Sequence, residues 1–203
     1  DPIDEFMNGV VTTKADEIVS FNPATGEEVG RVPITSAEDT AAALGRSRTA
    51  FQTWKQTTFA ARKRLVMAAR EVILAEVDEI AHLISSESGK PFGEAIAFEV
   101  APVLDLMQHF ARKTERMLRP AKIDIGLFKP LGRSSKIVYH PLGVVGIIPA
   151  WNYPFSIPLG EAIMALMAGN TVIIKPSELT PMTGLKIAEV FEKAGFPAGT
   201  VQV

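Results

Sequence analysis

The chain contains no cysteine among its 203 residues. Disulfide bonds, thiolate metal sites and a cysteine nucleophile are therefore excluded within it. A strong charge is also absent, because a formal net charge of −2 gives no electrostatic reason to expect nucleic acid or a membrane surface as a partner. No apolar run approaches the roughly 20 residues that span a bilayer, and no apolar secretory core is found at the N-terminus. We expect a cytoplasmic protein.

Several common functional motifs are missing as well. No G-x-G-x-x-G turn follows a predicted strand, and no G-x-S-x-G elbow occurs. Gly89-Lys90 does not form a phosphate loop, because Ile84 stands where that motif needs glycine and Pro91 replaces its hydroxyl residue. The three histidines lack the spacing of metal ligands or a catalytic triad, so we expect no metal site. The composition, 47% apolar and 22% charged, is that of an ordinary globular protein.

The N-terminal region combines an irregular start with a hairpin. Asp1 to Phe6 precede Met7 and have no periodicity, so we interpret them as a cloning remnant. Residues 17–21 and 27–32 are two short segments around an Asn-Pro-Ala-Thr-Gly turn, a pattern that predicts a β-hairpin.

The next hundred residues have helical periodicity. Thr35 followed by Glu38 has the capping-box spacing and predicts a helix to about Trp54. Thr58 begins the next helix, which we expect to end at Ser88-Gly89-Lys90. Its apolar stripe consists of Val66, Ala69, Ile73, Val77, Ile80 and Ile84. A third helix begins at Pro91, with a kink expected at Pro102, and its stripe consists of Phe92, Ile96, Val100, Val103, Met107 and Phe110. Stripes of this kind indicate core packing rather than a cofactor site.

A second hairpin is predicted by two strands, residues 123–128 and 135–139, around Lys129 to Gly132. Such a hairpin has an open edge that needs covering, and an oligomer partner is one way to cover it.

The last third has the pattern of a βαβ unit. We predict alternating strands and helices at residues 143–149, about 156–168, 171–175, about 181–194, and from 200 onward. Gly169 and Gly195 stand where helix ends favour a left-handed residue. The fold class is therefore α/β, with a partial doubly wound parallel sheet preceded by a helical region and a hairpin. The last residues resemble a strand that is only beginning, so we expect the chain to be truncated.

Polar residues follow both strands of this unit, where ligands of parallel sheets gather. Asn152 lies between Pro149 and Pro154, and a stiff loop would preorganise its amide as a donor to a developing oxyanion; the alternative is an asparagine that only satisfies a turn. Lys175 and Glu178 would together bind vicinal hydroxyls of a ribose. Alternatively, Lys175 only marks where the strand meets solvent, and Glu178 only lies near the start of the next helix.

Taken together, these segments resemble the aldehyde dehydrogenase superfamily. The resemblance covers nearly the whole chain after residue 17 and is carried by several motifs in the family's order. They are Asn22-Pro23-Ala24-Thr25-Gly26, Ser88-Gly89-Lys90-Pro91, the run from Gly143 to Pro154, Ala168 to Val172, Lys175 to Pro181, and Ala194 to Gly199.

The resemblance implies that a cysteine thiolate attacks an aldehyde, that Asn152 helps to hold the oxyanion, and that hydride passes to the cofactor. The implied cofactor-binding residues are Ile148, Pro149, Ala150, Trp151, Asn152, Lys175, Ser177 and Glu178. NAD is favoured, because Glu178 would repel a 2′-phosphate, and NADP is the alternative. The implied organisation is a disordered or tag-derived segment 1–16, a hairpin and helical part 17–121, an oligomerisation hairpin 122–141 and the first βαβ units 142–203. The protein should form a homo-oligomer, a dimer or a tetramer.

Two departures from the family pattern matter. Ala150 precedes Trp151 where many members have proline, and the family's nucleophilic cysteine and general-base glutamate lie beyond Val203. We therefore expect an N-terminal portion of an aldehyde dehydrogenase that is inactive by itself. The alternative is a non-catalytic nucleotide-binding or assembly module.

Overall fold

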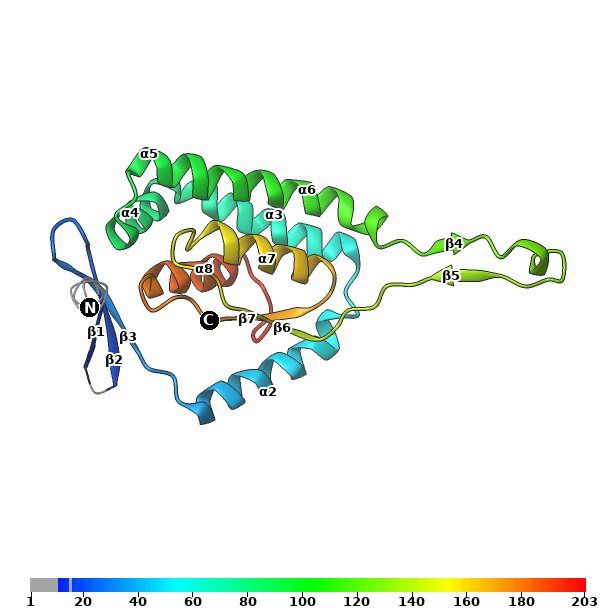
Figure 1. Ribbon diagram of the computed structural model, residues 1–203, viewed down its shortest axis with the longest axis horizontal. Coiled ribbons are helices and arrows are strands. Elements are labelled where there is room, and N and C mark those ends of the chain that lie inside the picture. Colours follow the sequence, from blue (N-terminus) through cyan, green and yellow to red (C-terminus); the bar gives the residue numbers. More distant parts are fainter. Residues whose placement is uncertain (1–10, 15) are drawn as a thin grey trace.

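A computed structural model describes residues 11–14 and 16–203 of the chain (Figure 1). The suspected cloning remnant, Asp1 to Phe6, lies outside the described residues. The first sheet is antiparallel and has the order β1-β2-β3, formed by Val11–Lys14, Glu17–Phe21 and Glu28–Pro33. The predicted hairpin is β2-β3. The expectation of disorder throughout 1–16 was wrong for Val11–Lys14, because this segment pairs along the edge that β2 would otherwise leave open.

Three helices follow, α2 (Ala37–Trp54), α3 (Phe59–Ala75) and α4 (Val77–Ser88). The cap of α2 is shifted by one residue from the predicted box, because the Ser36 hydroxyl accepts the N–H of Asp39 at 3.0 Å. Thr58 caps α3 as predicted. The single helix expected from 58 to 88 is broken at Glu76, whose φ of −115° and ψ of 20° are not helical. The break directs α4 toward α8.

The third helical segment changes its winding. It consists of α5 (Phe92–Glu94), the π-helical segment η1 (Ala95–Val100) and α6 (Ala101–Met117). A kink was expected at Pro102, and the structure has this π-helical segment just before that residue. Proline has no N–H to donate to the carbonyl four residues earlier, which favours a wider turn at this position.

The second hairpin is an arm that projects from the body of the molecule (Figure 1). It pairs β4 (Ala121–Ile123) with β5 (Ser135–Ile137), and η2 (Gly126–Phe128) lies near its tip. The predicted first strand, 123–128, is therefore shorter and begins earlier. Gly126 adopts a φ of 56° and donates its N–H to the Asp124 carboxylate at 3.2 Å, which turns the chain out of the strand.

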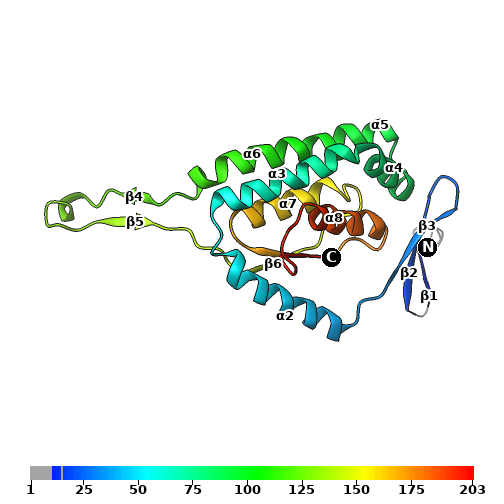
Figure 2. The same cartoon turned by 180° about the vertical axis from the view of Figure 1, so that it is seen from behind.

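A parallel sheet positions the predicted site. Its order is β6-β7-β8, formed by Val144–Ile147, Thr171–Ile174 and Val201–Gln202. The crossover helices α7 (Ser156–Met167) and α8 (Pro181–Lys193) lie on one face, and α2 covers the other (Figures 1 and 2). Gly169 and Gly195 have φ values of 94° and 79°, as their places after helix ends predicted. The α/β class and the partial doubly wound sheet are confirmed.

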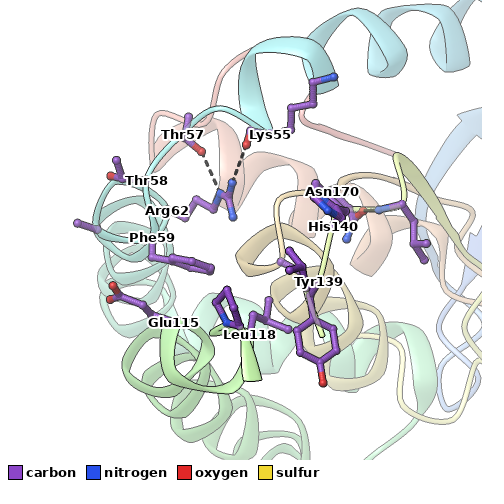
Figure 3. A pocket seen from close by; sticks show the side chains of 16 residues that line it. Lys55, Thr57, Thr58, Phe59, Arg62, Glu115, Leu118, Tyr139, His140 and Asn170 are labelled. Atoms are coloured by element: carbon purple, nitrogen blue, oxygen red, sulfur yellow. Dashed lines mark hydrogen bonds between the residues drawn. The ribbon is translucent and has the colours of Figure 1, made fainter. Parts of the chain in front are cut away.

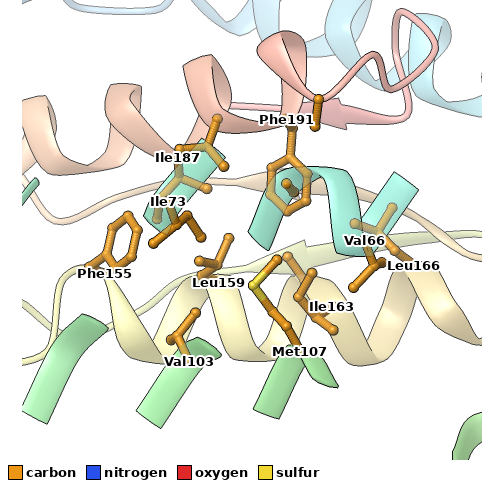
Figure 4. Close-up of a cluster of buried hydrophobic side chains, with 14 of the residues drawn as sticks. Val66, Ile73, Val103, Met107, Phe155, Leu159, Ile163, Leu166, Ile187 and Phe191 are labelled. Atoms are coloured by element: carbon orange, nitrogen blue, oxygen red, sulfur yellow. The ribbon is translucent and has the colours of Figure 1, made fainter. Parts of the chain in front are cut away.

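The core lies where α7 and α8 meet the outer helices α3 and α6 (Figure 4). The buried side chains shown there include Val66, Ile73, Val103, Met107, Phe155, Leu159, Ile163, Leu166, Ile187 and Phe191. Most members of the two predicted stripes are buried in this core. No helix in the described part of the chain is long and apolar enough to cross a bilayer.

Candidate functional site

The predicted site residues follow β6 and β7 at the same edge of the sheet. The N–H of Lys175 donates to the carbonyl of Ile147 at 2.9 Å, so the ends of the two strands are adjacent. Ile148 is 78% exposed and Trp151 is 58% exposed, and Asn152, Lys175 and Glu178 are exposed as well. Two apolar side chains and three polar ones therefore present free surface at this edge.

The remaining predicted residues are Pro149, Ala150 and Ser177, and of these only Ala150 is exposed. Pro149 is buried and Ala150 is exposed in the loop after β6. Ser177 is buried, and its hydroxyl accepts the N–H of Leu179 at 3.2 Å, which shapes the turn after β7. The Lys175 ammonium lies 3.7 Å from the Glu178 carboxylate. The two groups are thus held within reach of one small polar ligand.

An ion pair between Lys90 and the buried carboxylate of Glu99 holds the loop that carries Asn152. The Lys90 ammonium donates to the backbone carbonyl of Asn152 at 2.9 Å and lies 4.2 Å from the centre of the Tyr153 ring. It also contacts the carboxylate of Glu99, which is fully buried. The second oxygen of Glu99 accepts the N–H groups of Phe155 and Ser156, at 3.2 and 2.9 Å. Glu99 therefore caps the N-terminus of α7.

A second buried carboxylate caps α8 in the same way. The two oxygens of Glu87 accept the N–H groups of Met182 and Thr183, both at 2.7 Å, and the Thr183 hydroxyl donates to the same carboxylate. Burial raises the pKa of Glu87, and these hydrogen bonds partly oppose that rise. Helix N-termini are the usual anion sites of dinucleotide folds. In this chain, protein carboxylates already occupy that position on both crossover helices.

Sequence reasoning missed the roles of Lys90, Glu99 and Glu87. A weak signal existed for Glu99, which stands three residues after Ile96 and four before Val103, on the side of the apolar stripe. A carboxylate at such a position is buried only when it has partners. Glu87 gave a similar signal, because it stands three residues after Ile84 of the other stripe, whereas Lys90 lies outside both stripes and gave none.

Two hollows lie near these elements. One, of about 410 Å³, is bordered by Glu87, Lys90, Trp151, Asn152 and Thr180, among others. It therefore adjoins the loop that carries the predicted site residues.

The other hollow, of about 670 Å³, lies at the base of the arm and contains none of the predicted site residues (Figure 3). Its buried Arg62 donates to the carbonyls of Met167 and Lys55 and to the Thr57 hydroxyl. Burial lowers the pKa of Arg62. These bonds connect three chain segments, so Arg62 has a structural role.

The described residues also contain a group of three carboxylates close enough to hold a cation, Glu76, Glu79 and Glu189. The Lys186 ammonium lies among them, at 2.9, 2.6 and 3.2 Å. Burial lowers the pKa of Lys186, but the hydrogen bonds to the carboxylates outweigh it and the net change is a rise. The lysine supplies the positive charge here, and we assign no metal to the group.

A sequence model described as the aldehyde dehydrogenase family matches residues 10–203. The chain belongs to the aldehyde dehydrogenase family. It is 36% identical over 187 residues to a 1-pyrroline-5-carboxylate dehydrogenase of Geobacillus thermodenitrificans, an alignment that covers 92% of this chain and 35% of that protein. The chain thus spans about a third of the length of the curated relatives it matches.

Solved aldehyde dehydrogenases share the fold. The enzyme of Brucella melitensis biovar abortus superposes with a TM-score of 0.85 at 33% identity, covering 91% of this chain and 37% of that one. An aldehyde dehydrogenase of Mycobacterium tuberculosis, described as complexed with NAD+, gives a TM-score of 0.84 at 31% identity and covers 93% and 38%. An Escherichia coli enzyme described as NADP dependent gives 0.85 at 30% identity, covering 92% and 38%.

Proposed function

We propose that this chain is the N-terminal part of a longer, NAD-dependent aldehyde dehydrogenase that oxidises an aldehyde to a carboxylic acid. The observation that carries the proposal is the edge of the parallel sheet. There an exposed amide, Asn152, stands on a loop held by an ion pair, next to the strand end that carries Lys175 and Glu178. Family membership supports the same reaction class.

The residues of this edge fit a dinucleotide in part. Lys175 and Glu178, 3.7 Å apart, would donate to and accept from the hydroxyls of a ribose. Ile148 and Trp151 would cover apolar faces of the same ligand. When bound, the cofactor accepts a hydride from the substrate carbon. We favour NAD over NADP because the Glu178 carboxylate would repel a 2′-phosphate.

Asn152 is proposed to act on the substrate oxygen. Addition of a thiolate to an aldehyde carbonyl moves negative charge onto that oxygen, and a preorganised amide N–H lowers the cost of that charge. The thiolate must come from outside these residues, because the chain has no cysteine. The chain alone is therefore proposed to be inactive toward aldehydes.

The arm formed by β4 and β5 is proposed to join copies of the enzyme. Leu127, Phe128 and Leu131 near its tip are 89%, 63% and 73% exposed. Apolar side chains gathered in this way are typical of an interaction surface. A cytoplasmic location is the remaining part of the proposal.

The test is Asn152→Ala in the longer protein. We expect kcat to fall by roughly 10²–10³-fold, the usual effect of removing one oxyanion donor. The first substrate to use is the compound in the names of the relatives, 1-pyrroline-5-carboxylate, followed by a panel of simple aldehydes. A loss of less than about fivefold would restrict Asn152 to shaping its loop. Aldehyde-dependent NADH formation by the purified 203-residue chain would contradict the proposal that this chain alone is inactive.

A further inference from the structure

The ion pair between Lys90 and Glu99 holds the Asn152 loop from two sides. Upstream, Lys90 binds the carbonyl of Asn152 itself, at 2.9 Å. Downstream, Glu99 binds the N–H groups of Phe155 and Ser156, where the loop enters α7. The two charged groups contact each other, and their side chains are 14% and 0% exposed. The backbone of Asn152 is therefore connected through one ion pair to the helix that follows it.

Capping of α7 alone does not explain the lysine. Glu87 caps α8 through the same kind of carboxylate, and its recorded partners are N–H and hydroxyl groups. At α7 the carboxylate is supplemented by an ammonium group. The contact that Lys90 adds to this arrangement is the one to the Asn152 carbonyl, together with the Tyr153 ring.

Both Lys90 and Glu99 lie in segments with unusual backbone conformations. Lys90 follows Gly89, which has a left-handed φ of 72°, and precedes Pro91. Glu99 lies in the π-helical segment η1, a winding that occurs frequently at functional sites. Burying two charges is costly unless their geometry is satisfied. The contacts of Lys90 and Glu99 meet that requirement while also fixing the loop.

We propose that Lys90 and Glu99 are positioning residues for Asn152, setting where its side-chain amide stands relative to the substrate oxygen. This inference rests on the proposed function of Asn152. Neither residue is assigned a contact with substrate. Because a misplacement of about 1 Å can cost about 10²-fold in rate, we expect Lys90→Met to lower kcat by about 10–100-fold with little change in KM.

A double-mutant cycle in the longer protein separates positioning from other roles. If Lys90 acts through Asn152, Lys90→Met should cost less than about threefold once Asn152→Ala is present. Full additivity of the two losses would overturn the positioning role while leaving the proposed function intact. Wild-type turnover in Asn152→Ala would overturn both. If Lys90→Met does not fold, Glu99→Gln replaces it in the cycle, because glutamine keeps the shape of the side chain and one acceptor oxygen. Unchanged turnover in Glu99→Gln would refute the proposal.

Lys186→Met is the matched control. Like Lys90, Lys186 is paired with carboxylate, and its side chain is 3% exposed. Its carboxylate partners lie in α4, α8 and the break at Glu76 rather than in the loop. We expect this variant to be less stable than wild type but to keep kcat within about threefold. An equal loss of kcat in the control would show that destabilisation, and not positioning, lowers the rate.

A second measurement needs only the 203-residue chain. Lys90→Met should speed amide hydrogen exchange at Phe155 and Ser156 by about tenfold or more, because their N–H groups bind Glu99, which loses the ammonium that holds it. The control Lys186→Met should leave exchange at these two residues unchanged. Exchange at Phe155 and Ser156 that stays at the wild-type rate in Lys90→Met would overturn the inference without reference to activity.

Discussion

Gly184→Ala offers a direct test of how α8 packs on the turn after β7. Gly184 is buried in α8, and a Cβ at this position would lie 2.5 Å from Cβ and 2.6 Å from Cγ of Pro176. The proline ring cannot rotate away as a flexible side chain would. Either the helix or the turn that carries Lys175 and Glu178 must therefore move.

The expected magnitude is the difference of two opposing effects. Replacing glycine by alanine inside a helix normally stabilises a protein by up to about 1 kcal/mol. Overpacking of a dense interior costs typically about 1–3 kcal/mol. For Gly184→Ala we expect a net loss of about 1 kcal/mol, which corresponds to a fall in Tm of about 2–4 °C for a domain of this size.

Gly160→Ala in α7 is the matched control. It is also buried and helical, but its Cβ would lie 3.5 Å from Leu106 Cδ2, an ordinary contact distance. We expect a gain of about 0.5–1 kcal/mol from propensity. The two variants should therefore differ by about 2 kcal/mol in free energy of unfolding, measured by urea titration and thermal melting of the 203-residue chain. A Gly184→Ala protein as stable as Gly160→Ala would refute the packing argument.

Two further substitutions probe other parts of the structure. Lys186→Met should lower the free energy of unfolding by about 2 kcal/mol at neutral pH, less than for a fully buried pair because the carboxylates reach solvent. The pKa of Glu76 lies below its usual value of 4.5 through hydrogen bonds from Lys193 and Lys186. The paired Glu76 carboxylate therefore stabilises the fold above about pH 4.5, and this stability is lost as the pH falls through the lowered pKa. Urea titrations across this range should show a smaller loss of unfolding free energy in Lys186→Met than in wild type. Gly169→Ala should cost about 2–3 kcal/mol, because φ is 94° and a Cβ would lie 2.8 Å from Arg62 Nη2; a wild-type Tm would contradict this.

The parts of the fold that sequence predicted well are those with local signals. The βαβ unit follows from apolar runs and from glycines at the helix ends, and β6, β7 and α7 lie within a few residues of their expected positions. The break at Glu76 could not be predicted in this way, because the apolar stripe continues across it from Ile73 to Ile80. The break separates two helices with different main partners: α3 packs mostly on α6, whereas α4 packs on η1 and α8.

The candidate site shows the same difference between local and long-range signals. Asn152, Lys175 and Glu178 were predictable as neighbours of strand ends, because parallel strands share one carboxyl edge. The groups that hold them were not. Glu99 reaches its N–H partners across 56 and 57 residues of sequence, and Glu87 reaches its own across 95 and 96. Only the folded chain brings such pairs together.

The two carboxylate caps agree with the absence of a glycine-rich fingerprint at the starts of α7 and α8. In a dinucleotide fold with that fingerprint, glycines let the backbone approach the pyrophosphate at the first helix N-terminus. Here Glu99 and Glu87 occupy the N-termini of α7 and α8. A phosphate placed there would meet a buried negative charge and would displace hydrogen bonds that hold the helices.

In the proposed enzyme, we therefore expect the residues after β6 and β7 to bind the cofactor through its ribose and its apolar faces. Lys175, Glu178, Ile148 and Trp151 are exposed and available for such contacts. We expect the phosphates to be bound by groups other than the N-termini of α7 and α8, which Glu99 and Glu87 cap. The same caps that exclude phosphate fix the loop of Asn152 at one helix start and the turn after β7 at the other. The carboxylates that occupy these two helix N-termini thus also fix the segments around the proposed oxyanion donor, Asn152.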